Sequence, residues 1–313
     1  MIDGGHLRRL VSMADAVEAV REAFRLVSGG QFLAPQRVAV GGGTELLMAG
    51  RPVENPEGFV TKILTVRPEN PGRGLPLLHA VVLWFDGPTG EPLAVLDGET
   101  VTAMRTGAAS GVATDLLAAP DASTLALIGS GAQARDQVEA VLAVRQVREV
   151  RIFSRNETTA NELAATLAEA HTELDVRVVP TSSQAVRGAE VVCCATTARA
   201  PVFDAADVGP RTHVNAIGSY RPDMCEVPAE LLARSRVVVD QREAALAGAG
   251  DVIQAIEAGQ LDEKRLVEVG DLLLAAERQA SEAPTVFKSV GVSAQDWALA
   301  RVAVERAAAS AWS

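Results

Sequence analysis

The chain has 313 residues, with 29 lysines and arginines against 40 aspartates and glutamates, and a net charge of −11 at pH 7. At about 150 residues per domain, this length favours two domains. The acidic balance and an aromatic content of only 4% disfavour nucleic-acid binding. No apolar run reaches the roughly 18 residues needed to cross a bilayer, and the first residues do not resemble a signal peptide. We therefore expect a globular cytoplasmic protein that does not bind membranes.

Cysteine and lysine are both scarce. The cysteines, Cys193, Cys194 and Cys225, are odd in number and lack metal-binding spacing, which is typical of a reducing compartment. The four histidines show no paired spacing either, so no metal site is predicted. Lysine occurs at three positions, one of which is Lys62, and arginine takes the other basic positions. A lysine in this chain is therefore unusual.

The first third of the chain predicts one helix followed by a β-meander. Residues 12–28 have apolar side chains at helical spacing, behind a Ser12 cap and before Gly29. Short β-rich runs follow at 37–40, 45–48, 59–66, 78–85 and 92–96. Clusters of Gly, Pro and Asn separate them, and Pro88-Thr89-Gly90 is typical of a hairpin turn, so we expect a mostly antiparallel sheet. Residues 99–118 are Ala-rich and predict a second helix.

From Thr124 onward, apolar runs alternate with helical stretches. Strands are expected at 125–128, 150–153, 176–179, 191–195, 214–217 and 237–240, and helices at 132–144, 157–170 and 182–187. This alternation predicts an α/β fold, a Rossmann-type doubly wound parallel sheet covered on both faces. A last helix over 293–312, with Trp297, Val304, Ala308 and Ala311 on one face, is expected to return to the first domain. The predicted domains are residues 1–118 with 293–313, and residues 119–292.

A dinucleotide fingerprint follows the first of these apolar strands and opens a helix. It runs Gly129-Ser130-Gly131-Ala132-Gln133-Ala134. Gly129 permits the tight turn, Gly131 lets a pyrophosphate approach the backbone, and the helix amides face the anion. The residues expected at the cofactor include Gly129, Gly131, Ala132 and Gln133. A glycine-rich turn without a nucleotide is the alternative.

The end of the next strand indicates which cofactor is bound. NAD-binding folds usually place an acidic residue there for the ribose hydroxyls, but this strand ends in Phe153-Ser154-Arg155-Asn156. Ser154 and Arg155 suit a 2′-phosphate, so NADP(H) is preferred over NAD(H). The alternative is that Arg155 is an ordinary surface arginine.

Three cations lie at ordered positions in the first domain. Arg37 is expected in its first strand, Lys62 in a later strand, and Arg105 on the helix 99–118. Together they suit one small anion, whereas each alone would suit an exposed surface charge. The rarity of lysine favours a specific role for Lys62.

At this point the chain resembles the ornithine cyclodeaminase/mu-crystallin family over nearly its whole length. The matching segments are Pro35-Gln36-Arg37, Thr61-Lys62, residues 90–98, 102–106, 129–134 and 214–218, and Thr285-Val286-Phe287-Lys288-Ser289-Val290-Gly291. The resemblance implies a substrate-binding and dimerisation domain, completed by the C-terminal helix, with a Rossmann domain inserted. It also implies an active site in the cleft between them and a homodimer formed through the first domain.

The resemblance also implies roles for individual residues. Arg37, Lys62 and Arg105 match the segments that hold the substrate carboxylate, and Lys62 can also pass a proton. Further cofactor contacts are implied at Thr196, Ile217, Gly218, Ser219 and Val290.

One position departs from the ornithine cyclodeaminases. Their catalytic aspartate aligns with Tyr220, and Asp223 lies too far along the chain to inherit that role. The chain is therefore more similar to the ketimine reductases of the family. Tyr220 is a candidate hydrogen-bond or proton donor to the imine. A tyrosine that merely lines the cleft is the alternative.

The predicted function is therefore reduction of a cyclic ketimine, such as pyrroline- or piperideine-2-carboxylate, to the L-amino acid by NAD(P)H. The catalytic candidates are Lys62 and Tyr220. One alternative is an ammonia lyase that cyclises ornithine or lysine, and another is an alanine-type amino-acid dehydrogenase. A third is a non-catalytic, crystallin-like protein that binds NADP.

Overall fold

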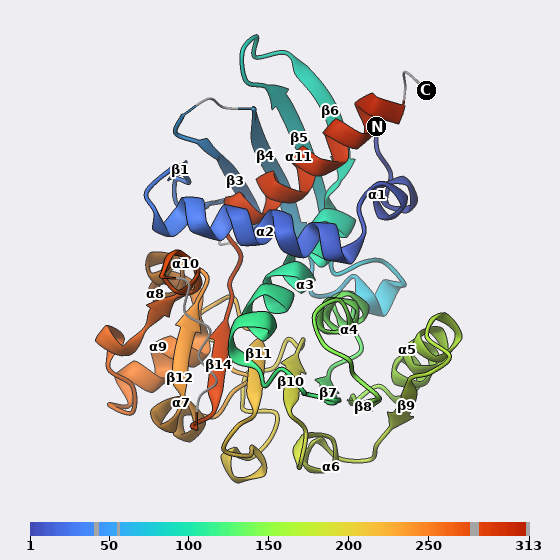
Figure 1. The fold of residues 1–313 in the computed structure, drawn as a ribbon, viewed down its shortest axis with the longest axis vertical. Helices are drawn as coiled ribbons and strands as arrows, with labels where there is room; N and C mark the ends of the chain where they lie inside the picture. The colour runs from blue at the N-terminus through green and yellow to red at the C-terminus, as the bar shows by residue number, and fades with distance from the viewer. Residues whose placement is uncertain (41–43, 55–56, 276–281, 311–313) are drawn as a thin grey trace. The chain divides into compact units, whose positions relative to one another are not determined.

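The computed structural model describes residues 1–40, 44–54, 57–275 and 282–310 (Figure 1). The chain separates into two compact units, Met1–Arg105 with Val292–Ser313, and Thr106–Gly291. The division falls within helix α3 (Gly98–Leu117), whereas the predicted boundary lies at the end of that helix. Within the described ranges, no helix is both long and apolar enough to span a membrane. The mixed α/β fold class is confirmed.

The first unit, Met1–Arg105 with Val292–Ser313, contains a six-stranded antiparallel sheet, as predicted. Its order is β1-β3-β4-β5-β6, and β2 also pairs with β3. The strands are β1 (Phe32–Leu33), β2 (Val38–Val40), β3 (Glu45–Pro52), β4 (Gly58–Val66), β5 (Leu78–Asp86) and β6 (Pro92–Asp97). The predicted hairpin turn is confirmed, because Gly90 adopts φ 74° and its N–H donates to the Asp86 carbonyl. Arg37 was expected in the first strand, but it lies in the loop just before β2.

Helices α2 (Met13–Ser28) and α11 (Ser293–Ser310) lie side by side across this sheet (Figure 1), near the short α1 (Gly4–Leu10). The predicted start of α2 is confirmed by a capping box in which Ser12 and Asp15 each accept the other's backbone N–H. Trp297 is buried and packs edge-on against Phe32. The apolar face predicted for α11 does not extend to Ala308. This residue is exposed because the last turns of α11 run beyond the residues that bury its earlier turns. Ala311 lies outside the described residues.

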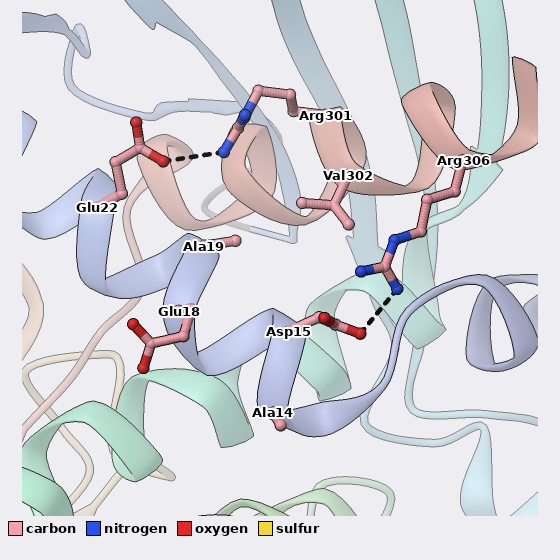
Figure 2. Close-up of a pocket in the computed structure, with 8 residues that line it drawn as sticks. All are labelled: Ala14, Asp15, Glu18, Ala19, Glu22, Arg301, Val302 and Arg306. Carbon is pink, nitrogen blue, oxygen red and sulfur yellow. Dashed lines mark hydrogen bonds and ion pairs between the residues drawn. The ribbon is translucent and has the colours of Figure 1, made fainter. Parts of the chain in front are cut away.

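Ion pairs join the exposed edges of these two helices. Figure 2 shows Arg301 pairing with Glu22 at 2.9 Å and Arg306 pairing with Asp15 at 2.7 Å. The four side chains border a pocket of about 370 Å³. Asp15 and Glu22 pair with the two arginines that line the pocket, and Glu18 adds one further acid to its wall. Exposed pairs of this kind add little stability, so the apolar contacts beneath them hold the helices.

The second unit, Thr106–Gly291, is built on an eight-stranded parallel sheet of order β13-β12-β14-β11-β10-β7-β8-β9. The strands are β7 (Thr124–Ile128), β8 (Glu149–Phe153), β9 (Asp175–Val178), β10 (Val191–Cys194), β11 (His213–Ala216), β12 (Arg236–Val239), β13 (Val267–Glu268) and β14 (Thr285–Lys288). The helices are α4 (Ala134–Leu142), α5 (Glu157–Ala170), α6 (Ser182–Val186), α7 (Ala229–Arg234), α8 (Arg242–Gly248), α9 (Gly250–Glu257) and α10 (Val269–Leu274). Short 3₁₀ helices in the described part of this unit span Ala205–Asp207 and Glu263–Arg265, and another in the first unit spans Pro71–Arg73.

The parallel sheet is buried on both faces, as its continuous apolar strands predicted. Leu125 and Leu127 of β7 belong to one hydrophobic cluster, while Ala126 and Ile128 belong to another. Strand order reverses between the neighbours β7 and β10, and a doubly wound fold binds its ligand at such a point, beyond the carboxyl ends of the strands. The fingerprint that starts at Gly129 follows β7 directly.

Candidate active site

Lys62 lies at the centre of a buried charged cluster in the first unit. It is the fifth residue of β4, and strand alternation places it on the same buried face as Val60 and Leu64, while Ile63 points to the other face. Its side chain is fully buried. The ammonium donates to Asp296 Oδ1 at 2.7 Å and to Thr102 Oγ1 at 3.4 Å. Lys62 is therefore held in a defined position by a carboxylate on α11.

Arg105 shares the same carboxylate. Its Nε lies 3.1 Å from Asp296 Oδ1, and its Nη1 donates to Gln295 Oε1 at 2.6 Å. The structure thus brings together two of the three predicted cations, on β4 and α3, through two residues in the first turn of α11. Neither Asp296 nor Gln295 was predicted, because an acid in the first turn of a helix is common for reasons of the helix dipole alone.

The cluster tunes the protonation of Lys62. Burial lowers the pKa of this ammonium to about 8, against the opposing attraction of Asp296. The positive charges of Arg105 and of the half-buried Arg37 lower the same pKa further, so the charge of the third predicted cation also acts on Lys62. An ammonium with a pKa near 8 can give up its proton near neutral pH.

Three polar atoms of this cluster are buried without a hydrogen-bond partner among the described residues. They are Asp296 Oδ2, an acceptor, and two donors, Gln295 Nε2 and Arg105 Nε, the latter in the ion pair with Asp296. Buried polar groups are normally paired, so such atoms indicate a place for a polar ligand. Beside two cations, they suit a small molecule that carries both a carboxylate and an N–H group.

The fingerprint loop of the second unit fits a dinucleotide. Gly129 has φ +105°, and a Cβ there would lie 2.5 Å from the Ala195 carbonyl oxygen, so this turn requires glycine. Around Gly131 a Cβ would meet nothing within 4 Å, which leaves room for a pyrophosphate beside the backbone. Helix α4 begins after Gln133, whose side chain forms no cap hydrogen bond. The first amides of α4, next to the exposed Ala132, therefore have no side-chain cap and suit an anion.

The tip of β8 carries no carboxylate. Ser130 Oγ, in the fingerprint, donates to Ser154 Oγ at 2.8 Å and is also hydrogen-bonded to Thr159 Oγ1 at 2.6 Å. The fingerprint loop and the end of β8 are thereby joined. Arg155 is exposed and forms no ion pair within the described parts of the chain.

The other predicted cofactor contacts lie on loops after β10, β11 and β14. Glu226 accepts hydrogen bonds from the backbone of Thr196, Gly218 and Ser219, and Ile217 beside them is buried. Asp240 Oδ2 accepts from Ser289 Oγ and from the amides of Val290 and Gly291. A buried carboxylate therefore holds the backbone of each of these loops through hydrogen bonds. Sequence reasoning missed both acids, since each follows an apolar segment without any motif of its own.

Tyr220 follows these loops and is half-buried in the second unit. The next acid, Asp223, pairs with Arg221 at 2.7 Å and with Arg199 at 3.3 Å. Its carboxylate is therefore paired with two guanidinium groups.

Comparison with known proteins identifies relatives along the whole chain. A family model described as the ornithine cyclodeaminase/mu-crystallin family matches residues 5–311. A Delta(1)-pyrroline-2-carboxylate reductase of Bacillus cereus is 35% identical over 98% of this chain and 96% of its own.

Solved structures show the same fold. The Thermococcus litoralis Delta(1)-pyrroline-2-carboxylate reductase, in complex with NADH and L-proline, superposes with a TM-score of 0.93 at 32% identity, over 99% of this chain and 98% of its own. An archaeal alanine dehydrogenase dimer with bound NAD superposes with a TM-score of 0.90 at 31% identity, over 99% of this chain and 96% of its own. The chain therefore belongs to the ornithine cyclodeaminase/mu-crystallin family.

Proposed function

We propose that this protein is an NAD(P)H-dependent imine reductase that converts a cyclic ketimine, such as pyrroline- or piperideine-2-carboxylate, to the L-amino acid. The observation that carries this proposal is the buried cluster of Lys62, Arg105 and Asp296. It offers positive charge to a carboxylate and a proton to the neighbouring nitrogen. The reduced cofactor, when bound, supplies the hydride that the imine carbon accepts.

Each residue of the cluster has a distinct task. Arg37 and Arg105 hold the substrate carboxylate, and a guanidinium can do so through two parallel hydrogen bonds. Lys62 gives its proton to the imine nitrogen as the carbon receives the hydride, so the C=N bond becomes a CH–NH bond. Asp296 balances the charge of the cations, which would otherwise repel a protonated imine. Holding the substrate in one orientation supplies much of the catalysis.

Tyr220 is proposed as a second hydrogen-bond donor to the substrate. It stands where the cyclodeaminases have an aspartate, and a protonated phenol cannot act as their base at neutral pH. Tyr220→Phe keeps the ring and removes the hydroxyl. A loss of imine reductase activity in this variant, with unchanged cofactor affinity, would support the assignment.

NADP(H) is proposed as the preferred cofactor. Arg155 is exposed at the tip of β8, Ser154 stands next to it, and β8 carries no acid at its tip that would repel a 2′-phosphate. NAD(H) is the alternative, since the solved relatives named above hold NADH and NAD.

A homodimer is proposed through the open face of the antiparallel sheet. Exposed apolar side chains adjoin one another there by strand register, since Val38 pairs with Leu47 and Leu47 pairs with Ile63. An apolar face of this kind is typical of a subunit interface. The archaeal alanine dehydrogenase is a dimer. Ile63→Asp should convert a dimer to a monomer in sedimentation analysis.

The activity is tested by following cofactor oxidation with pyrroline- and piperideine-2-carboxylate, using NADPH and NADH in parallel. We expect turnover with at least one ketimine and a product of L configuration. Oxidation of alanine without ketimine reduction would make the protein an amino-acid dehydrogenase. Ammonia release from ornithine or lysine without net cofactor change would make it a lyase. Tight cofactor binding without turnover over the whole panel would favour a binding protein.

A further inference from the structure

One buried carboxylate ties together the loops that follow β10 and β11. Glu226 is fully buried. Its Oε1 accepts the Thr196 N–H at 2.6 Å, and its Oε2 accepts the N–H groups of Gly218 at 2.6 Å and Ser219 at 3.1 Å. The loops approach so closely that a Cβ on Gly218 would clash with the Thr196 backbone. Three N–H donors aimed at the two oxygens favour the ionised carboxylate, which is the form that accepts at both oxygens without donating.

Glu226 belongs to a buried triad with two further charged groups. Asp251 Oδ1 accepts the backbone N–H of Glu226 at 2.5 Å, and Asp251 Oδ2 pairs with Lys288 Nζ at 2.8 Å. Burial raises the pKa of Glu226 above its usual value and the charge of Asp251 adds to this, while the charge of Lys288 and the Thr196 hydrogen bond oppose it. With all three groups ionised, two negative charges face one positive charge. The triad therefore carries a net negative charge inside the domain.

The topology places this charge under the nicotinamide half of the cofactor site. The pyrophosphate loop starts at Gly129 after β7, and the 2′-phosphate candidates lie at the tip of β8. A doubly wound fold binds its dinucleotide across the point where strand order reverses, so the second half of the cofactor lies over β10 and β11. Thr196, Gly218 and Ser219 are on that side.

We infer that the Glu226–Asp251–Lys288 triad makes the site prefer the oxidised cofactor over the reduced one. The nicotinamide ring is cationic when oxidised and neutral when reduced, so a fixed negative charge beneath it stabilises only the oxidised form. The inference rests on the proposed nicotinamide binding. Its consequence for the proposed reaction is that hydride donation becomes more favourable at this site. Glu226 acts as a positioning residue, because it acts through the loops and its field.

The test compares dissociation constants for oxidised and reduced cofactor, measured by calorimetry and by the fluorescence of the reduced form. Glu226→Gln should weaken binding of the oxidised form about 3- to 30-fold more than binding of the reduced form, as expected for a unit charge in partly screened surroundings. Glu226→Asp keeps the negative charge that Glu226→Gln removes, so the ratio of the dissociation constants for oxidised and reduced cofactor should be closer to that of the wild type. Lys288→Met makes the triad more negative and should move the ratio the opposite way.

Glu190→Gln is the matched control. Glu190 Oε2 also accepts backbone N–H groups, from Ser123 at 2.7 Å and Thr124 at 3.1 Å, but it does so at the amino end of β7. This variant should leave the ratio unchanged. If Glu226→Gln weakened binding of the oxidised and the reduced cofactor equally, Glu226 would only hold the loops in place, and the inference would be overturned. Failure of the wild-type protein to bind any nicotinamide nucleotide would overturn the proposed function as well, and binding is measured without turnover.

Discussion

The two units use buried charge in opposite ways. In the first unit, Lys62 and Arg105 pair with the single carboxylate of Asp296, and the proposed chemistry rests on these side chains. In the second unit, Glu226 and Asp240 accept backbone N–H groups from three loops, so the proposed cofactor would meet mainly the main chain there. Substitutions in the charged cluster of the first unit should therefore change the reaction of the substrate, whereas substitutions in the loops of the second unit that Glu226 and Asp240 hold should change cofactor affinity.

Lys62→Met gives the strongest test of this contrast. Methionine keeps the volume of the side chain and removes the transferable proton, so kcat/KM for imine reduction should fall about 10²- to 10⁴-fold. Cofactor affinity should stay unchanged, since the cofactor is assigned to the second unit. The matched control is Lys264→Met, which alters an exposed lysine. Retention of full kcat/KM by Lys62→Met would remove this residue from the mechanism.

Asp296→Asn should change both stability and pH dependence. It leaves two buried cations without their shared carboxylate, a loss that typically costs about 3–5 kcal/mol in the free energy of unfolding. The proposed proton transfer needs protonated Lys62, so wild-type imine reduction should decline as pH rises through about 8. Asp296 raises the pKa of Lys62, and its removal should move this decline to lower pH. Denaturant unfolding and a kcat/KM profile measure the two effects.

An unchanged pH profile in Asp296→Asn, with the protein still folded, would show that Asp296 does not control Lys62. The unfolding measurement separates this outcome from a general loss of structure.

Arg105→Lys should raise the KM for the ketimine about 10- to 100-fold, with a smaller effect on kcat. Lysine keeps the charge but loses the planar pair of donors and the bond to Gln295. The control is Arg25→Lys, an exposed position on α2. A KM equal to that of wild type would show that Arg105 serves the ion cluster without binding substrate.

The same contrast explains how much of the fold could be predicted. Features set by residues close together in the chain could be predicted. Ser12 marked the start of α2, and the continuous apolar strands indicated a parallel sheet buried on both faces. Helices α7 to α10 and strands β13 and β14 were not predicted. They are short, and neighbouring elements stabilise them more than their own periodicity does.

The site divides in the same way. Lys62 was identifiable because lysine is rare, and the fingerprint because it follows an apolar strand. Their partners were not, since Asp296 lies 234 residues from Lys62 along the chain and Glu226 lies 30 residues from Thr196. A carboxylate that pairs only in the folded chain has no local signature. Sequence alone therefore indicated candidate ligand-binding groups but not the carboxylates that pair with them in the folded chain.

Arg155→Ala gives the smallest expected effect and tests a charged side chain that the proposal assigns to the cofactor in the second unit. Because Arg155 is exposed, salt screens its charge, and its loss should weaken NADPH binding only about 10-fold while NADH binding stays the same. The difference should shrink as ionic strength rises. Arg148→Ala, an exposed arginine at the other end of β8, is the control. Equal losses for NADPH and NADH would place Arg155 outside the 2′-phosphate site, and cofactor choice would then depend on the backbone and on Ser154.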